Sequence, residues 1–413
     1  MYPLLHRPHI LALILSLLPV HCVFSQTVLV QGTYAEGQAV KSNYAAQHYM
    51  NEGRRMRYYG LEATWRAKGA TDSINVYDQL WGRPEVGGGL MVGDFSHIPL
   101  FATSKLEHPD YKSTIGQMVT FYTTFRRDLL RTSHWSLGYK MENGVGVCTK
   151  PFDLHTNLQN IIIGSPLTVY VGMGFFAQYR PTRHWSIGID GAFRHYSNGR
   201  LTQPNAGVNT LDVGLRVGYI LRPDTLNHSP FSRPKDHTWK RHLYADFNLS
   251  WSPQTIYGQF EADRLLPPEE RAEHYQLYSG VALRGALMYH YRRKFASGLA
   301  LDYTYVPYID EFRKADLACG HDATGRYSRH VVGIGIAHEA FWHDFSIAMS
   351  VGYYLFRHQG VTETSFEKPY FETVGLRYYL PMSQRRLYVG YNIKASAVHA
   401  SGMQFGVGFC PWK

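Results

Sequence analysis

The sequence predicts an all-β fold, a transmembrane antiparallel β-barrel of about 14 strands, with a range of about 12–16. Three observations lead to this prediction. Many segments of about ten residues alternate apolar and polar side chains, the period of a strand with one face in an apolar environment. The polar faces repeatedly carry Arg, Asp, Lys and Gly. The composition has 31 Tyr, 38 Gly and only 18% charged residues, which is typical of a barrel with aromatic girdles.

The N-terminal part of the chain is expected to lie outside this barrel. Residues 1–25 have a positive flank at Arg7 and an apolar run at 10–20, the pattern of a secretory signal peptide. Residues 26–54 show no clear period and are expected to form an N-terminal segment. The outer-membrane barrel is then predicted over 55–413.

The strands are predicted one by one from their alternation. Tyr59, Leu61, Ala63 and Trp65 form the apolar face of the first strand. Each later strand repeats this pattern, and a further hairpin within 68–115 would raise the count to about 16. The alternating segments lie at 59–65, 119–125, 135–141, 167–177, 185–193, 211–217, 243–249, 283–289, 299–303, 332–336, 345–351, 374–378, 387–393 and 403–409.

Links between the strands alternate between short and long, as in bacterial barrels with short periplasmic turns and longer outer loops. This alternation places the link 198–208 on the outer side and both termini in the periplasm. The exception is 222–240, which is long where a short turn is due and contains three prolines. It could separate two smaller barrels. One continuous barrel is preferred because it leaves no strand edge unpaired, and a soluble sandwich is the less favoured alternative.

Composition also limits the ligands. The net charge of +10 fits either a solvated basic surface or attraction to an anionic partner such as phosphorylated lipid head groups. No compact Lys/Arg run with stacking aromatics is present, so nucleic acid is not expected. The three cysteines after the signal segment have no metal spacing, and no cofactor or metal is expected. Charged residues on the polar faces predict an ion-paired lumen or, alternatively, a pore lining: Asp190, Asp212, Arg216, Arg284, Asp302, Arg377 and Lys394.

The strand that begins at Trp185 contains two of the candidate catalytic residues. Its apolar face continues to His195 and then Ser197, just before the outer loop. Asn209 has the parity of the apolar face of the next strand, so the three side chains can meet on the lipid-facing wall. They would supply a base, a nucleophile and an orienting group. Asn198, Asn205 or nearby backbone N–H groups could stabilise an oxyanion.

Residues 191–219, GAFRHYSNGRLTQPNAGVNTLDVGLRVGY, resemble the lipid A 3-O-deacylase (PagL-like) family of outer-membrane barrels. The similarity rests on a His-x-Ser-Asn run followed by a Pro-Asn-x-Gly turn. Residues 150–191 and the second half of the chain are similar to the longer, Bacteroidetes-type members known as acyloxyacyl hydrolases. The resemblance thus extends over the mature chain.

This resemblance implies an esterase, embedded in the outer membrane of a Gram-negative cell, that removes an acyl chain from the lipid A of lipopolysaccharide. It implies Ser197 as nucleophile and His195 as general base. The family has a Glu at the position of Asn209, and this chain departs from it there. An Asn can hold the imidazole tautomer but cannot stabilise imidazolium as a carboxylate does. The acyl position, the oligomeric state and whether the lumen is open are left undetermined by the sequence.

Two other functions remain open at this point. One is a non-enzymatic barrel, either a porin, a channel or an inactive homologue, which Asn209 and the strands beyond a minimal barrel favour. The intact pair of His195 and Ser197 disfavours it. The other is an acyltransferase that uses the same nucleophile with a different acceptor.

Overall fold

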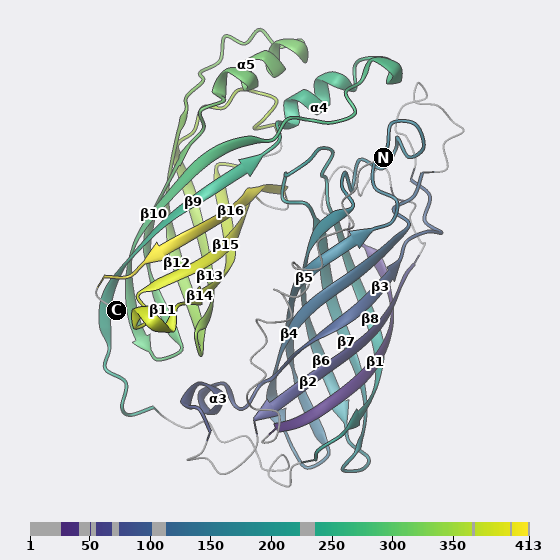
Figure 1. Cartoon of the computed structure of the whole chain (residues 1–413), viewed down its shortest axis with the longest axis vertical. Helices are drawn as coiled ribbons and strands as arrows, with labels where there is room; N and C mark the ends of the chain where they lie inside the picture. The colour runs from purple at the N-terminus through teal and green to yellow at the C-terminus, as the bar shows by residue number, and fades with distance from the viewer. Residues whose placement is uncertain are drawn as a thin grey trace.

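The computed structural model describes residues 26–40, 50, 55–67, 74–100, 113–223, 236–365, 368–396 and 399–411. The predicted signal peptide, 1–25, lies outside these residues. Within them the chain forms two closed barrels of eight antiparallel strands each (Figure 1). The first consists of β1 (Gln26–Ala39), β2 (Met56–Ala67), β3 (Glu85–Asp94), β4 (Gln117–Arg131), β5 (Trp135–Cys148), β6 (Leu167–Tyr179), β7 (Trp185–Ser197) and β8 (Val208–Ile220). The second consists of β9 (His242–Gln254), β10 (Tyr278–Arg292), β11 (Phe295–Tyr305), β12 (His330–Trp342), β13 (Phe345–Phe356), β14 (Tyr370–Tyr379), β15 (Leu387–Ser396) and β16 (His399–Phe409).

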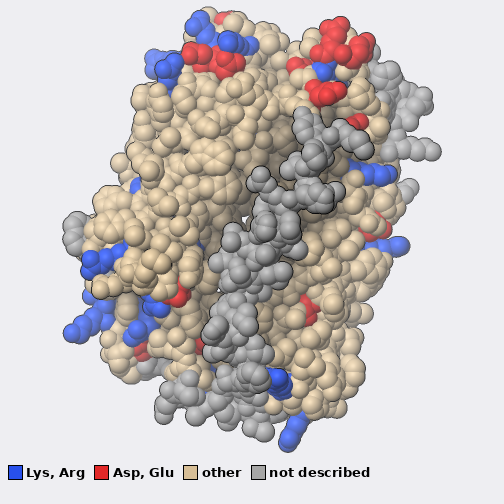
Figure 2. Space-filling view, in the orientation of Figure 1, with Lys and Arg blue, Asp and Glu red and all other residues tan. Residues whose placement is uncertain are grey.

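Side chains alternate between the outside and the lumen along the strands. Outward residues are large and apolar, and Phe175, Val213 and Ile336 are 71%, 69% and 68% exposed. Apolar side chains at this exposure need an apolar surrounding, which the hydrocarbon region of a membrane supplies. On the face shown in Figure 2, charged side chains gather mainly toward the ends of the barrels, with a largely uncharged wall between them.

Buried ion pairs lie in both lumens. In the first barrel, Asp190 accepts from Arg216 at 2.9 Å and from Lys140 at 2.6 Å. In the second, Arg377 lies 2.9 Å from Asp246 and 3.2 Å from Glu339. The side chains of these six residues are all less than 7% exposed. An ion-paired interior, as predicted at Asp190, Arg216 and Arg377, is therefore present in both barrels.

Among the described residues, three α-helices lie in the links between strands. The helices α4 (Tyr257–Asp263) and α5 (Ile309–Ala318) stand together at one end of the second barrel, and α3 (Val76–Trp81) lies at the opposite end, between the barrels (Figure 1). We call these the α4/α5 end and the α3 end. Short 3₁₀ turns form at η4 (Pro268–Glu270) and η5 (Pro381–Ser383). In the described part of the chain no helix has the length and apolarity to cross a membrane.

The single barrel predicted over 55–413 is corrected to two. The ladder between β8 and β1 runs from Leu29↔Ile220 to Ala39↔Thr210 and closes the first barrel before β9 begins. Strand alternation is the same whichever strands pair, so the period does not encode where a sheet closes. The exceptional link 222–240 is the connection between the barrels, as the alternative prediction had it.

Two strands account for the difference between 14 and 16. The predicted N-terminal segment 26–54 contains β1, and 68–115 contains β3 rather than a hairpin. β1 has Glu36 on its outward face, so the two faces of this strand differ little in polarity. β3 has three consecutive glycines, and a Cβ at the last of them, Gly89, would lie 2.6 Å from the Tyr122 ring. Glycine is thus required inside this barrel, and it removes the alternation that predicts a strand.

Candidate active site

His195, Ser197 and Asn209 meet at the α4/α5 end of the first barrel. His195 and Ser197 lie at the end of β7, and the antiparallel register places Asn209 of β8 directly opposite His195. All three have the parity of the outward apolar residues, as the sequence predicts. Exposure falls along this face, from 54% at Ile189 to 2% at Ser197. Neighbouring residues therefore cover Ser197 and Asn209, and His195 is half-buried.

The three side chains form a continuous hydrogen-bonded chain. His195 Nδ1 lies 2.6 Å from Asn209 Oδ1, and His195 Nε2 lies 2.8 Å from Ser197 Oγ. Because the amide oxygen only accepts, Nδ1 carries the proton in this arrangement. Nε2 is then unprotonated and accepts from the Ser197 hydroxyl. This is the protonation state in which an imidazole can activate a hydroxyl as a nucleophile.

The loop after Ser197 places the two predicted oxyanion residues differently. The Asn198 N–H donates to Asn205 Oδ1 at 2.9 Å, and the Asn198 side-chain amide donates to Thr202 O and Ser165 Oγ. Both kinds of Asn198 donor are therefore engaged. The side-chain NH₂ of Asn205 has no hydrogen-bond partner among the described residues and is half-buried beside the site.

Gly207 brings the loop close to His195 and Ser197. Its φ is +72°, a left-handed conformation that favours glycine. A Cβ at this position would lie 3.3 Å from His195 Cε1 and 3.4 Å from Ser197 Cβ. The last residue of the predicted Pro-Asn-x-Gly turn is thus required both by its backbone and by the close approach to the imidazole.

Asp212, the carboxylate nearest to the site in sequence, does not contact His195. It faces the lumen, where both of its oxygens accept from Arg194, at 2.7 and 3.1 Å. Arg194 also donates to Tyr170 Oη at 2.7 Å and to Glu142 at 3.2 Å. The lumen thus holds this carboxylate on the other side of the wall, and Asn209 is the residue that forms a hydrogen bond with His195 Nδ1.

A second Ser–His pair lies on the outward wall of the second barrel, which the sequence did not indicate because its members are on different strands. Ser297 Oγ of β11 is 2.9 Å from His338 Nδ1 of β12. His338 has no further hydrogen-bond partner in the part of the chain that the structure describes. Its neighbour Glu339 faces the lumen and binds Arg377. This pair lacks the third group and the loop donors of the first site. The described residues contain no cluster of three or more metal-ligating side chains.

The loop 198–207 also reaches the second barrel. The Arg200 carbonyl accepts from the Thr255 N–H at 2.8 Å and from Thr255 Oγ1 at 3.0 Å. The Arg200 guanidinium pairs with Glu363, and both side chains are less than 10% exposed. The sequence does not reveal these partners, because they lie more than 50 residues away from Arg200.

Two protein-family models match the chain, one over strands of each barrel. The family model for lipid A 3-O-deacylase (PagL) matches residues 57–219, and that for the acyloxyacyl hydrolase C-terminal domain matches residues 245–412. No curated protein sequence matches the chain.

Solved structures similar to the chain are outer-membrane proteins. The crystal structure of the outer membrane enzyme PagL is 17% identical, with 45% of this chain and 97% of that chain covered and a TM-score of 0.28. An outer membrane channel from Pseudomonas putida F1 is 8% identical, with 93% and 94% covered and a TM-score of 0.20. A mutant porin of Rh. blastica is 7% identical, with 93% and 99% covered and a TM-score of 0.16.

Proposed function

Since the chain belongs to the lipid A 3-O-deacylase (PagL) family and carries its acyloxyacyl hydrolase C-terminal domain, we propose that it is an outer-membrane esterase that removes an ester-linked acyl chain from lipid A with Ser197 as nucleophile and His195 as base. One observation carries the mechanism. The hydrogen-bonded chain from Ser197 through His195 to Asn209 lies on the outward wall, inside the region that matches the family.

The reaction follows from the protonation state. Ser197 Oγ attacks the ester carbonyl while His195 Nε2 takes its proton, and Asn209 Oδ1 holds the Nδ1–H of the imidazolium. The tetrahedral intermediate collapses as Nε2–H protonates the leaving alcohol of the lipid, which forms a Ser197 acyl ester. Water then attacks this ester with His195 again as base, and the fatty acid leaves with Ser197 restored.

The surroundings suit a lipid ester. Below His195 on the same wall lie the exposed apolar residues Ile189, Leu211 and Val213, against which an acyl chain can lie in the outer leaflet. We propose that the α4/α5 end faces outward, because its links are the longer ones. The buried ion pairs of both lumens disfavour a porin or channel, because a water-filled path needs interior volume that these side chains occupy.

Asn205 is proposed to supply the oxyanion donor, through the side-chain NH₂ that has no partner among the described residues. We expect Asn205→Asp to lower kcat by about 10²–10³-fold with little change in KM. This variant keeps the Oδ acceptor for the Asn198 N–H, so the loop should keep its conformation, while it removes the donor and places a negative charge beside the developing oxyanion. Steady-state kinetics on lipid A micelles measures the effect. Wild-type kcat in Asn205→Asp would exclude the donor role.

Asn209 is expected to limit the rate. Replacing it by the isosteric Asp places a negative charge beside the imidazolium that forms in the transition state, at the 2.6 Å contact with Nδ1. We expect Asn209→Asp to raise kcat by about 10- to 100-fold, equivalent to about 1.4–2.7 kcal/mol. Asn209→Ala serves as the opposite control and should lower kcat, because nothing then holds the tautomer. An unchanged or lower kcat in Asn209→Asp would show that Asn209 is not the orienting group.

Mass spectrometry of lipid A from cells that express the wild type, Ser197→Ala or His195→Ala tests the function itself. The expected result is the loss of one hydroxyacyl mass with the wild type alone and the appearance of free fatty acid. Transfer of the acyl chain to another lipid would identify an acyltransferase instead. Unchanged lipid A in all three, with each protein folded in the outer membrane, would favour a non-enzymatic barrel.

A further inference from the structure

The turn that follows the nucleophile is held by the second barrel at three residues. Thr255, at the end of β9, donates twice to the Arg200 carbonyl, at 2.8 and 3.0 Å. Glu363, in the link between β13 and β14, binds the Arg200 guanidinium. Gly199 lies against β16, where an added Cβ would meet Met403 Cγ at 2.2 Å. We call Arg200, Thr255 and Glu363 the inter-barrel clamp.

Hydrogen bonds to the helices of the α4/α5 end hold the clamp residue Glu363 and its neighbour Thr362 in place. The second oxygen of Glu363 accepts from Gly258 N of α4 at 3.3 Å. Its neighbour Thr362 donates its N–H to Asp316 of α5 at 2.8 Å, and Tyr327 Oη donates to the same carboxylate at 2.6 Å. Burial raises the pKa of Asp316, but these hydrogen bonds outweigh it and hold the pKa below its usual value. The carboxylate therefore stays charged at neutral pH and keeps the link in place.

We propose that the second barrel is a positioning part of the active site, and that the inter-barrel clamp holds Ser197 in line with His195. Gly199 and Arg200 have φ of +62° and +67°, two successive left-handed residues only two and three positions after the nucleophile. Arg200 has a Cβ, so this conformation is unfavourable for it unless other contacts hold it. Those contacts come from the second barrel. This inference rests on the proposed esterase function.

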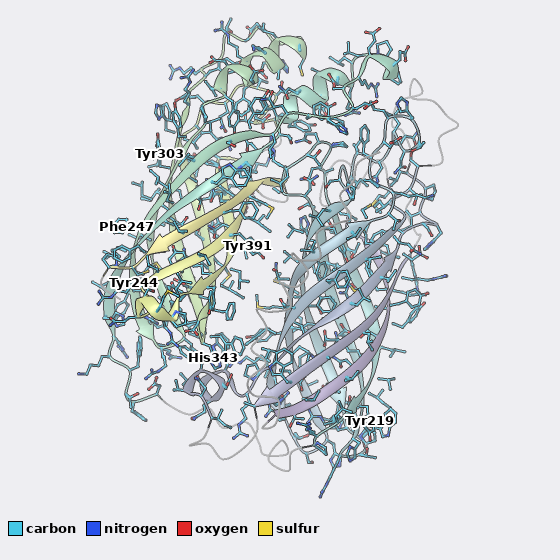
Figure 3. The ribbon with its side chains drawn as sticks, viewed as in Figure 1. Tyr219, Tyr244, Phe247, Tyr303, His343 and Tyr391 are labelled. Carbon is cyan, nitrogen blue, oxygen red and sulfur yellow. The ribbon has the colours of Figure 1, made fainter. Side chains whose placement is uncertain are left out.

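The barrels also contact each other at a distance from the site. A variant at this second contact can therefore distinguish an effect on the position of Ser197 from an effect on the association of the barrels. At the α3 end, Trp81 Nε1 donates to Phe341 O at 2.7 Å. Asp78 accepts from Trp342 Nε1 at 2.9 Å and lies 3.0 Å from Nε2 of His343, which Figure 3 labels beside α3. Asp78 thus contributes to the barrel contact without any connection to Ser197. Asp78→Asn is the matched control, because it weakens the association of the barrels and leaves the clamp intact.

The test uses the full-length protein refolded in detergent micelles. The variants are Arg200→Met, Glu363→Gln, Thr255→Val and Thr255→Ser, with folding followed by the heat-induced shift of the barrel on gels. Each is measured for kcat and KM on lipid A and for the rate at which a small fluorophosphonate labels Ser197. Fluorophosphonate labelling reports the reactivity of the nucleophile without requiring lipid binding.

We expect Arg200→Met and Glu363→Gln to lower kcat and the labelling rate together, by about 10- to 100-fold, with KM within about two-fold. Thr255→Val should lower kcat and the labelling rate by a smaller factor. Thr255→Ser should keep the wild-type values, because it keeps the hydroxyl donor. Asp78→Asn should stay within about two-fold of wild type. If Arg200→Met does not fold, the comparison of Thr255→Val with Thr255→Ser tests whether the clamp positions Ser197.

Wild-type labelling and kcat in the folded clamp variants would overturn this inference and leave the esterase intact. Loss of activity equal in Asp78→Asn and the clamp variants would also overturn it, because the effect would then come from barrel association. A wild-type protein that neither deacylates lipid A nor reacts with the fluorophosphonate would instead refute the proposed function.

Discussion

Ser197→Ala is expected to lower hydrolysis of lipid A by about 10⁴–10⁶-fold, because no other group of the site can form the acyl ester. His195→Ala should cause a loss of the same order, since Nε2 of His195, at 2.8 Å, is the hydrogen-bond partner of Ser197 Oγ within the described part of the chain. The two losses should not add in the double variant, because the residues act as one unit. The rate of fatty acid release by purified protein in micelles measures all three.

Ser297→Ala is the matched control for this prediction. Ser297 is also an outward serine, 2.9 Å from a histidine nitrogen, so the variant removes the same atoms from the same kind of pair. We expect its activity to equal that of wild type, since His338 has no orienting partner among the described residues. A large loss in Ser297→Ala together with an active Ser197→Ala would move the active site to the second barrel.

Arg194→Ala is expected to give the largest loss of stability, about 3–5 kcal/mol. Arg194 binds both oxygens of Asp212 and also Glu142, and its guanidinium lies 4.9 Å from the centre of the Tyr58 ring. Removing it leaves Asp212 buried in the lumen without an ion-pair partner among the described residues, while Glu142 keeps Lys140 at 2.8 Å. Such an uncompensated charge is costly in a low-dielectric interior. Urea titration of the refolded barrel, followed by the heat-induced gel shift, measures the change.

The control for Arg194 is Arg329→Ala at the α4/α5 end. Arg329 also pairs with an aspartate, Asp310 at 3.0 Å, but the two side chains are 48% and 72% exposed. An exposed pair contributes little, so we expect a change within about 0.5 kcal/mol. Equal effects of the two variants would contradict the view that buried ion pairs hold the lumen together.

The site was more predictable from sequence than the topology. Parity alone places His195, Ser197 and Asn209 on one face and Asp212 on the other, because strand side chains alternate strictly. The antiparallel register then brings His195 and Asn209 together. Position in the sequence does not distinguish Asn198 from Asn205. The structure does so, because the loop engages the Asn198 donors and leaves the Asn205 NH₂ without a partner among the described residues.

Barrel closure and the inter-barrel clamp could not be predicted. Closure depends on β8 pairing with β1 rather than β9, which alternation within a strand does not encode. The alternation does not show β3, because it contains Gly87, Gly88 and Gly89. These glycines are needed where residues of the neighbouring strands, among them Tyr122, approach closely. Arg200 and Glu363 are 163 residues apart, and a single charged residue in a loop gives no signal of its partner.

The most direct test of the account is detection of the acyl-enzyme. The purified protein is mixed with lipid A and quenched in acid during the first turnover. The mass of the peptide that contains Ser197 is then measured by mass spectrometry. We expect this peptide to carry the added mass of one acyl chain, and we expect no such addition in Ser197→Ala. The fraction of acylated peptide should rise when deacylation is slowed. Release of fatty acid by Ser197→Ala at the wild-type rate, with no adduct on the wild-type peptide, would contradict the account.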